Sequence, residues 1–199
     1  MPEASDLQIR PANEASWEDL QAVFGARGQA ARCQCQRYKL RPREAFATQP
    51  VEERASRLRE QTDCGDPGST TTSGLVAYLE GEPVGWCAVE PRPEFPGLRH
   101  SPVPWAGRDE DRGDASVWAI TCVLARARFR KRGISKALIR AAVDHARARG
   151  ATALEAYPMT TTAAIAEEIH VGTVGSYLEA GFTEVSRPTQ RRAVVRLTF

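Results

Sequence analysis

An apolar run, a basic turn and an amphipathic helix follow one another in the middle of the chain. Residues 116–124 predict a buried strand, because this apolar run is short and is interrupted only by Thr121. Residues 135–149 predict a helix with apolar and charged sides, which Gly150 ends. Residues 151–158 predict the next strand. This order is typical of a parallel β-α-β step, so we expect a mixed α/β fold.

The other segments predict further strands and helices around this step. A Glu-Gly-Glu turn joins residues 74–81 and 82–91 in an expected hairpin. Residues 92–114 contain four prolines and a charged run, and they predict a long loop that is either functional or disordered. The remaining expected strands cover 6–12, 183–187 and 192–199, and the remaining expected helices cover 17–24, 51–62 and 173–180.

Composition narrows the class of protein. The chain has 199 residues, of which 42% are hydrophobic and 26% charged, and these values fit one folded domain. The net charge of +2 gives no support to nucleic-acid binding. No apolar run is long enough to span a membrane, and MPEASDLQIR shows no secretory signal. An odd number of cysteines, five, favours a reducing compartment. We therefore expect a cytoplasmic protein without nucleic-acid or membrane partners.

The basic turn before the central helix has the form Arg-x-x-Gly-x-Ser, from Arg130 to Ser135. Backbone N–H groups at a helix N-terminus form an anion site, and Gly133 leaves room for a phosphate beside the backbone. Ser135 is expected to add a hydroxyl donor or to cap the helix. The turn lacks both the Rossmann and the Walker pattern. The alternative interpretation is a capped helix with a solvated basic turn.

Two motifs at a matching separation carry a family resemblance. FRKRGISKAL (129–138) is similar to the pyrophosphate loop of the GNAT superfamily of N-acetyltransferases, and SYLEAGF (176–182) resembles its Tyr-x-x-x-Gly-Phe segment. VGWCAVEPR (84–92) and EAYP (155–158) resemble a bacterial subgroup of this superfamily. The resemblance implies a GNAT-like fold, with a central mixed β-sheet of about seven strands flanked by about four helices. It also implies that residues 1–199 form a single GNAT-like acetyltransferase domain.

The resemblance further implies an acetyl-CoA-dependent N-acetyltransferase. Acetyl-CoA would be the cosubstrate, and the acetyl group would pass directly to a primary amine of a small molecule or peptide. The turn amides would hold the pyrophosphate, the edge of the central strand would pair with pantetheine, and His170 stands where the family often has an asparagine. The expected coenzyme-binding residues are Val123, Leu124, Ala125, Arg130, Lys131, Arg132, Gly133, Ile134, Ser135, Lys136, His170 and Tyr177.

Catalytic roles follow from the same resemblance. Tyr177 would protonate the leaving thiolate, and the Val123 amide would stabilise the oxyanion. Family members often carry a glutamate base on the fourth strand, but the aligned position here is Ala119. The candidate bases from other elements are Glu90, Glu155 and Asp114. A carboxyl group in this role needs a pKa raised by burial.

The Cys33-Gln-Cys35 pair lies in the region that forms the acceptor side of the cleft in this family. Two cysteines could form half of a zinc site, but no second cysteine pair is evident, so we expect no metal. We expect two packed thiols near the substrate wall. A redox or covalent role is the alternative.

Two other functions stay open. A non-catalytic acyl-CoA-binding regulatory module is favoured by Ala119 and disfavoured by Tyr177. An accessory domain that binds nucleic acid or protein through its arginines is disfavoured by the net charge. The sequence does not identify the acceptor, and it leaves a homodimer open.

Overall fold

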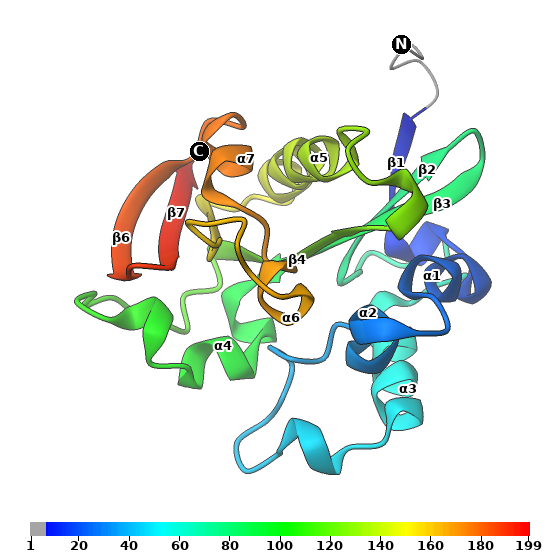
Figure 1. Ribbon diagram of the computed structural model, residues 1–199, viewed down its shortest axis with the longest axis horizontal. Helices are drawn as coiled ribbons and strands as arrows, with labels where there is room; N and C mark the ends of the chain where they lie inside the picture. Colours follow the sequence, from blue (N-terminus) through cyan, green and yellow to red (C-terminus); the bar gives the residue numbers. More distant parts are fainter. Residues whose placement is uncertain (1–6) are drawn as a thin grey trace.

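The computed structural model describes residues 7–199, apart from the side chains of residues 166 and 167. Within this range all strands join one mixed sheet in the order β1-β2-β3-β4-β5-β7-β6 (Figure 1). Neighbouring strands are antiparallel, apart from the parallel pair β4–β5. The strands are β1 (Leu7–Pro11), β2 (Gly74–Leu79), β3 (Glu82–Pro91), β4 (Val117–Ala125), β5 (Ala153–Ala156), β6 (Thr183–Thr189) and β7 (Arg192–Thr198).

These strands confirm the seven that the sequence predicts, including the parallel step from β4 through the helix Ile134–Ala148 to β5. Residue 6, the first residue of the first expected strand, lies outside the described residues. The same is true of residues 1–5, which belong to the stretch MPEASDLQIR that shows no secretory signal. Among the described residues, no helix has the length and apolar character needed to cross a bilayer.

The four predicted helices correspond to α1, α3, α5 and α7, and three short helices in expected loops were missed. Each missed helix has six residues or fewer, too few to show a helical periodicity in the sequence. In chain order the helices are α1 (Trp17–Phe24), α2 (Gly28–Cys33), α3 (Val51–Thr62), α4 (Pro96–His100), α5 (Ile134–Ala148), α6 (Ala166–Ile169) and α7 (Val174–Leu178).

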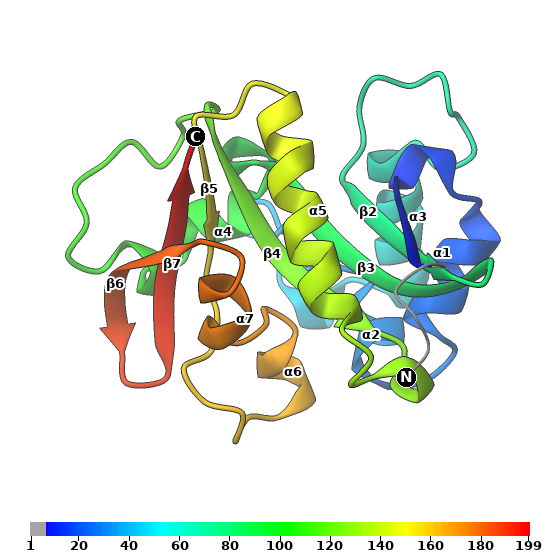
Figure 2. The same ribbon diagram turned by 90° about the horizontal axis from the view of Figure 1, so that it is seen from above.

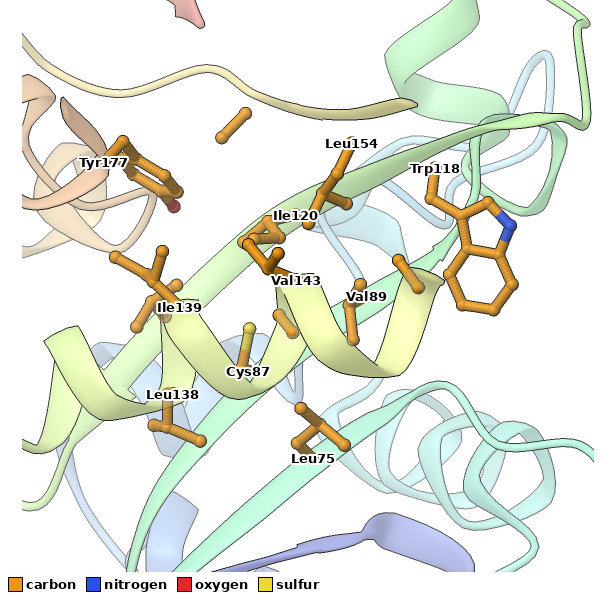
Figure 3. Packing of buried hydrophobic residues seen from close by; sticks show 14 of the residues in the cluster. Leu75, Cys87, Val89, Trp118, Ile120, Leu138, Ile139, Val143, Leu154 and Tyr177 are labelled. Atoms are coloured by element: carbon orange, nitrogen blue, oxygen red, sulfur yellow. The ribbon is translucent and has the colours of Figure 1, made fainter. Parts of the chain in front are cut away.

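The helices cover both faces of the sheet. α5 and α7 lie on one face, and α1 to α4 lie on the other (Figures 1 and 2). The long α5 places Leu138, Ile139 and Val143 against side chains of β3 and β4 (Figure 3). A Cβ at Gly85 would lie 2.8 Å from Ile134 Cγ2, so glycine allows α5 to approach β3 closely. Burial of each large apolar side chain stabilises this packing by about 1.5–3 kcal/mol.

The centre of β4 is irregular where the site forms. The β3–β4 register shifts between Ala88 and Val89, which pair with Cys122 and Ile120, so Thr121 occupies a β-bulge. Pairing between β4 and β5 also stops at Ile120. The last part of β4 therefore has no strand partner on the β5 side in the described chain, and its edge faces the segment between β5 and α7.

Candidate active site

The turn that precedes α5 is shaped to hold an anion. Gly133 has φ +79° and occupies the N-cap position, where no side chain caps the helix. The Ala137 N–H donates to the Gly133 carbonyl oxygen at 3.0 Å. No heavy atom lies within 4 Å of a Cβ built on Gly133, so the space beside the turn is open. The prediction that Ser135 caps this helix is wrong, because Ser135 is already its second residue.

Positive charge surrounds the same turn. Arg130, Lys131 and Arg132 are exposed, and Lys136 forms an ion pair with Glu179 at 2.7 Å. Helix N-terminal amides and nearby cations together favour phosphate groups. The turn can therefore bind the pyrophosphate of a nucleotide-like ligand.

The unpartnered edge of β4 is closed by the segment after α6. The Val123 N–H donates to the His170 carbonyl oxygen at 2.7 Å. The Tyr177 hydroxyl donates to the next carbonyl, that of Val171, at 2.9 Å. Leu124 and Ala125 complete this edge and are half-buried. The family resemblance gives catalytic roles to the Val123 N–H and the Tyr177 hydroxyl. In this structure both groups donate hydrogen bonds to carbonyl groups of consecutive residues.

Tyr177 itself is fully buried on the α5 side of the sheet (Figure 3). Its ring meets that of Phe182 edge to face, with 5.3 Å between centroids. Burial raises the pKa of Tyr177 well above its ordinary value, so the phenol stays protonated and can act only as a donor at neutral pH. The ring of His170 lies elsewhere, 6.3 Å from the ring of Tyr38, on the wall of a cavity.

Two of the candidate bases flank the position that lacks a carboxylate. Ala119 pairs with Glu90 of β3 on one side and with Glu155 of β5 on the other. Residues directly opposite one another in a sheet project from the same face. The two carboxylates therefore lie on the face opposite α5, one strand away from Ala119 in each direction.

Glu155 is the centre of a buried ionic network. It has no exposed surface, and its carboxylate accepts from Arg196 Nε at 2.8 Å and from the Tyr157 hydroxyl at 3.0 Å. Arg108 and Arg92 also contact it, and Glu110 joins the same arginines. This geometry fastens the 92–114 loop to β5 and β7. Arginines and a phenol thus contact both carboxylate oxygens of Glu155.

Glu90 has different surroundings. Its side chain is 11% exposed and forms an ion pair with Lys39, whose ammonium also lies 4.6 Å from the ring centroid of Phe95. Burial raises the pKa of Glu90 to about 7, although the charge and hydrogen bond of Lys39 act in the opposite direction. A carboxyl group with this pKa is suited to accept a proton near neutral pH.

Asp114 lies just before β4, where its carboxylate accepts from the Ser116 hydroxyl at 2.7 Å and the Ser116 N–H at 2.9 Å. These bonds lower its pKa, and the side chain is solvated. Asp114 therefore orders the start of the strand and is a weaker base than Glu90.

The cysteines form no disulfide in the described chain, and Cys35 and Cys122 pack in or against the cluster that contains Trp86. Trp86 Nε1 donates to Cys35 Sγ at 3.2 Å, and Cys35 also lies beside Cys122 of β4. The hydrogen bond from Cys122 lowers the pKa of Cys35, with burial acting in the opposite direction, whereas burial raises the pKa of Cys33. No group of three or more potential metal ligands was found among the described residues.

Two neighbouring cavities open on the face opposite α5. The larger has a volume of about 340 Å³ and the smaller about 210 Å³, and Tyr38, Ser101 and Arg192 line both. The further lining residues of the larger cavity are Arg37, Gly97, Glu168 and His170. The sequence did not single out Tyr38, Lys39 or Arg192 as site residues. The basic and aromatic run after the cysteine pair contains Tyr38 and Lys39, whereas Arg192 lies far away at the start of β7.

Comparison with known proteins defines the family. The model of the acetyltransferase (GNAT) family matches residues 35–167, so the chain belongs to this family. A search of curated protein sequences found no match.

Solved structures show the same fold. A GCN5-related N-acetyltransferase from Kribbella flavida is 17% identical, with a TM-score of 0.57 over 99% of this chain and 100% of that chain. The acetyltransferase yncA from Salmonella typhimurium, solved with acetyl-CoA, is 14% identical, with a TM-score of 0.56 over 98% of this chain and 94% of that chain. The paia N-acetyltransferase from Thermoplasma acidophilum, solved with coenzyme A, is 13% identical, with a TM-score of 0.52 over 97% and 99%.

Proposed function

We propose that the protein is an acetyl-CoA-dependent N-acetyltransferase that transfers an acetyl group directly to a primary amine of a small molecule or peptide. The observation that carries this proposal is the position of Glu90. It is a nearly buried carboxyl group with a pKa of about 7, one strand from Ala119 on the acceptor face. A base at this position compensates for the missing carboxylate of β4.

The turn before α5 holds the coenzyme in this proposal. The amides that begin the helix and the cations from Arg130 to Lys136 bind the pyrophosphate, and the unpartnered edge from Val123 to Ala125 pairs with the pantetheine arm. The open space beside Gly133 supports this assignment. When bound, acetyl-CoA supplies an acyl group that a thioester activates for attack.

Glu90 accepts a proton from the amine, directly or through a water molecule. Lys39 lowers the pKa of Glu90 toward 7 against the effect of burial, so a substantial fraction of the carboxyl groups is ionised at neutral pH. Glu155 takes no part in proton transfer, since arginines and a phenol already occupy it. Its role in this proposal is to hold the 92–114 loop, which forms part of the acceptor wall.

Val123 and Tyr177 act at the acyl group. The Val123 N–H stabilises the developing negative charge on the carbonyl oxygen, and the Tyr177 hydroxyl protonates the leaving sulfur. Both groups donate to the 170–171 segment in this structure. A single displacement of that segment would release both donors, and the acyl carbonyl and the sulfur would replace its two carbonyl oxygens.

The second candidate is a regulatory module that binds acyl-CoA without turnover. The hydrogen bond between Val123 and His170 favours it, because it occupies the donor that catalysis requires. In this function the 170–171 segment would remain closed while coenzyme binds to the basic turn.

Thiol release with a panel of amines separates the two functions. The full chain is mixed with acetyl-CoA and amino acids, peptides, polyamines or aminoglycosides, and free coenzyme A is measured together with the acetylated product. An amine-dependent release with matching product supports the enzyme. Thermal stabilisation by acetyl-CoA without release by any amine supports the regulatory module.

A further inference from the structure

The larger cavity on the acceptor face has an excess of positive charge. Arg37 and Arg192 line it, and no ion pair joins either guanidinium to a carboxylate of the described chain. The carboxylate that also lines it, Glu168, is already paired with Arg191 at 2.9 Å. The cavity therefore contains two guanidinium groups that form no ion pair with a carboxylate of the described chain.

Both arginines lie close to one aromatic residue. Tyr38 lines the cavity, and the positive charges of Arg192 and Arg37 oppose the rise in its pKa that burial causes. Arg192 is half-buried at the start of β7, and Arg37 lies with its guanidinium 5.4 Å from the ring centroid of Phe46. Arg37 is exposed and is restrained by Phe46, whereas partial burial limits the side-chain conformations of Arg192, so an anion that binds Arg192 loses less side-chain entropy than at a fully exposed arginine.

The cavity is connected to Glu90 through adjacent residues. Tyr38 forms its wall and packs against the cluster that contains Ala119, while Lys39 reaches Glu90. The Gly97 N–H donates to the Tyr38 carbonyl at 2.9 Å and fixes this part of the backbone against α4. Glu90 itself lines neither cavity, so the link between it and the cavity runs through Lys39 and the neighbouring Tyr38.

The smaller cavity adds an apolar subsite. It shares Tyr38 and Arg192 with the larger one, and its other walls include Val103, Pro104 and Ala193. The apolar part of this wall accommodates a hydrocarbon or aromatic side chain. The two cavities thus place a cationic site and an apolar site side by side, with Tyr38 and Arg192 shared between them.

We propose that the acceptor is a free amino acid with an apolar side chain, whose carboxylate binds Arg37 and Arg192. This inference rests on the proposed function and specifies its substrate class. The amine faces Glu90, the carboxylate forms charge-assisted hydrogen bonds with the arginines, and the side chain enters the smaller cavity. Polycationic amines are disfavoured, because the cavity would repel their remaining charges.

Matched acid and amide pairs test the proposal. Acetyl transfer is measured with L-leucine against L-leucinamide and with L-phenylalanine against L-phenylalaninamide. We expect kcat/KM to be at least about tenfold higher for each acid, as one charge-assisted contact allows. The α-amine of an amino acid amide is less basic than that of the free acid, so a larger fraction of it is unprotonated at neutral pH. Amine reactivity alone would therefore favour the amides, and a preference for the acids has to come from recognition of the carboxylate.

Arg192→Gln should remove this preference by lowering kcat/KM for the acids, with little effect on the amides. The matched control is Arg187→Gln, which changes an exposed arginine of the same hairpin that is paired with Glu184 at 2.7 Å. Thermal stabilisation by acetyl-CoA checks that each variant folds and binds coenzyme. Equal use of acids and amides, better use of polyamines, or an unchanged preference in Arg192→Gln would overturn the inference and leave the acetyltransferase assignment intact.

If no amine is acetylated, the proposed function is rejected. A binding measurement then tests the proposed anion-binding acceptor site by itself. N-acetyl-L-leucine and N-acetyl-L-leucinamide are then compared as ligands by thermal stabilisation. Stabilisation by the acid alone, lost in Arg192→Gln, supports an anion-binding acceptor site. No stabilisation, or an equal effect of both compounds, rejects that site.

Discussion

The amide of Val123 and the carbonyl oxygen of His170 are joined by a 2.7 Å hydrogen bond. The bond connects the irregular end of β4 to the segment between α6 and α7. It shows that this β4 amide is directed at a position where a carbonyl oxygen fits, and that a backbone carbonyl occupies the position here. The pairing of pantetheine with this edge that we propose would therefore have to compete with the protein's own backbone.

Gly133→Glu should abolish binding of acetyl-CoA, because the new carboxylate would stand where the pyrophosphate binds. The measurement is thermal stabilisation by coenzyme A. Gly81→Glu is a matched control, since Gly81 also has φ +79° and open space around its Cβ, but lies in the β2–β3 turn. Both variants incur the backbone strain of a left-handed residue, so their apo melting temperatures should fall similarly. Normal stabilisation of Gly133→Glu by coenzyme would contradict the pyrophosphate site.

Glu90 should produce a pH dependence of kcat/KM with a midpoint near 7. A base must be ionised, so activity rises as pH increases through the pKa of about 7. Glu90→Gln should lower kcat/KM by about 10²–10⁴-fold and remove this ionisation from the profile. Full activity in Glu90→Gln would show that solvent or another group accepts the proton.

Lys39→Met should move that midpoint upward. The ammonium of Lys39 lowers the pKa of Glu90, so its removal leaves burial as the dominant effect. Loss of an opposite charge at this range is expected to raise the midpoint by about 1–3 pH units. Activity at high pH should recover toward the wild-type value, which distinguishes a changed pKa from a damaged site. A lower midpoint would be incompatible with this role for Lys39.

Tyr177→Phe should reduce kcat by about 10²-fold with nearly unchanged affinity for acetyl-CoA, because the ring remains and the proton donor is lost. The variant also leaves the buried carbonyl of Val171 without its partner, which costs about 1–3 kcal/mol of stability. Tyr78→Phe serves as a control, since it removes a phenol that donates to Asp19 at 2.9 Å on the other side of the molecule. If both variants retain wild-type kcat, and chemistry limits turnover, water protonates the thiolate.

Cys33→Ser combined with Cys35→Ser should retain substantial transfer activity, because the amine attacks the thioester directly. Trp86 Nε1 can donate to a serine oxygen at position 35 much as it does to sulfur. The measurement is thiol release by the double variant, with mass spectrometry of the wild-type protein after incubation with acetyl-CoA. An acetylated cysteine on the wild type, with a folded but inactive double variant, would indicate a covalent route.

Glu155→Gln should act mainly on stability. The substitution leaves Arg92, Arg108 and Arg196 with one negative charge fewer in a buried setting, and breaking such a network costs about 3–5 kcal/mol. Chemical denaturation measures the loss, and kcat of the folded fraction should stay close to the wild-type value. A stable variant with strongly reduced kcat would instead identify Glu155 as a catalytic group.

The sequence predicts the fold of this protein well, because its regular elements carry strong local signals. α5 shows a long apolar stripe, and the parallel step follows from the strand before it and the strand after it. α2, α4 and α6 have no such signal, since each is a short turn held by neighbouring elements. The 92–114 loop also looked irregular, although Arg92 and Arg108 anchor it through contacts distant in sequence.

The site was only partly predictable, because some of its residues belong to a local motif and others are brought together by contacts distant in sequence. The basic turn before α5 is a local motif, so its position could be read from the chain. Glu90 and Glu155 could not be ranked, because both are carboxylates on strands and differ only in their partners. Lys39 lies 51 positions from Glu90, and Arg196 lies 41 from Glu155. Such pairings depend on sheet order and on side-chain burial, which no local pattern specifies.

The parallel pairing of β4 and β5 spans only four residue pairs, from Val117 with Ala153 to Ile120 with Ala156. In the described chain this short pairing connects two groups of antiparallel strands, the first made of β1, β2, β3 and β4 and the second of β5, β7 and β6. A ligand arm that pairs with the rest of β4 would extend the contact between the two groups. We therefore expect bound coenzyme to hold the two groups of strands together. Hydrogen exchange at the backbone amides of β5 and β7 should then slow when coenzyme binds.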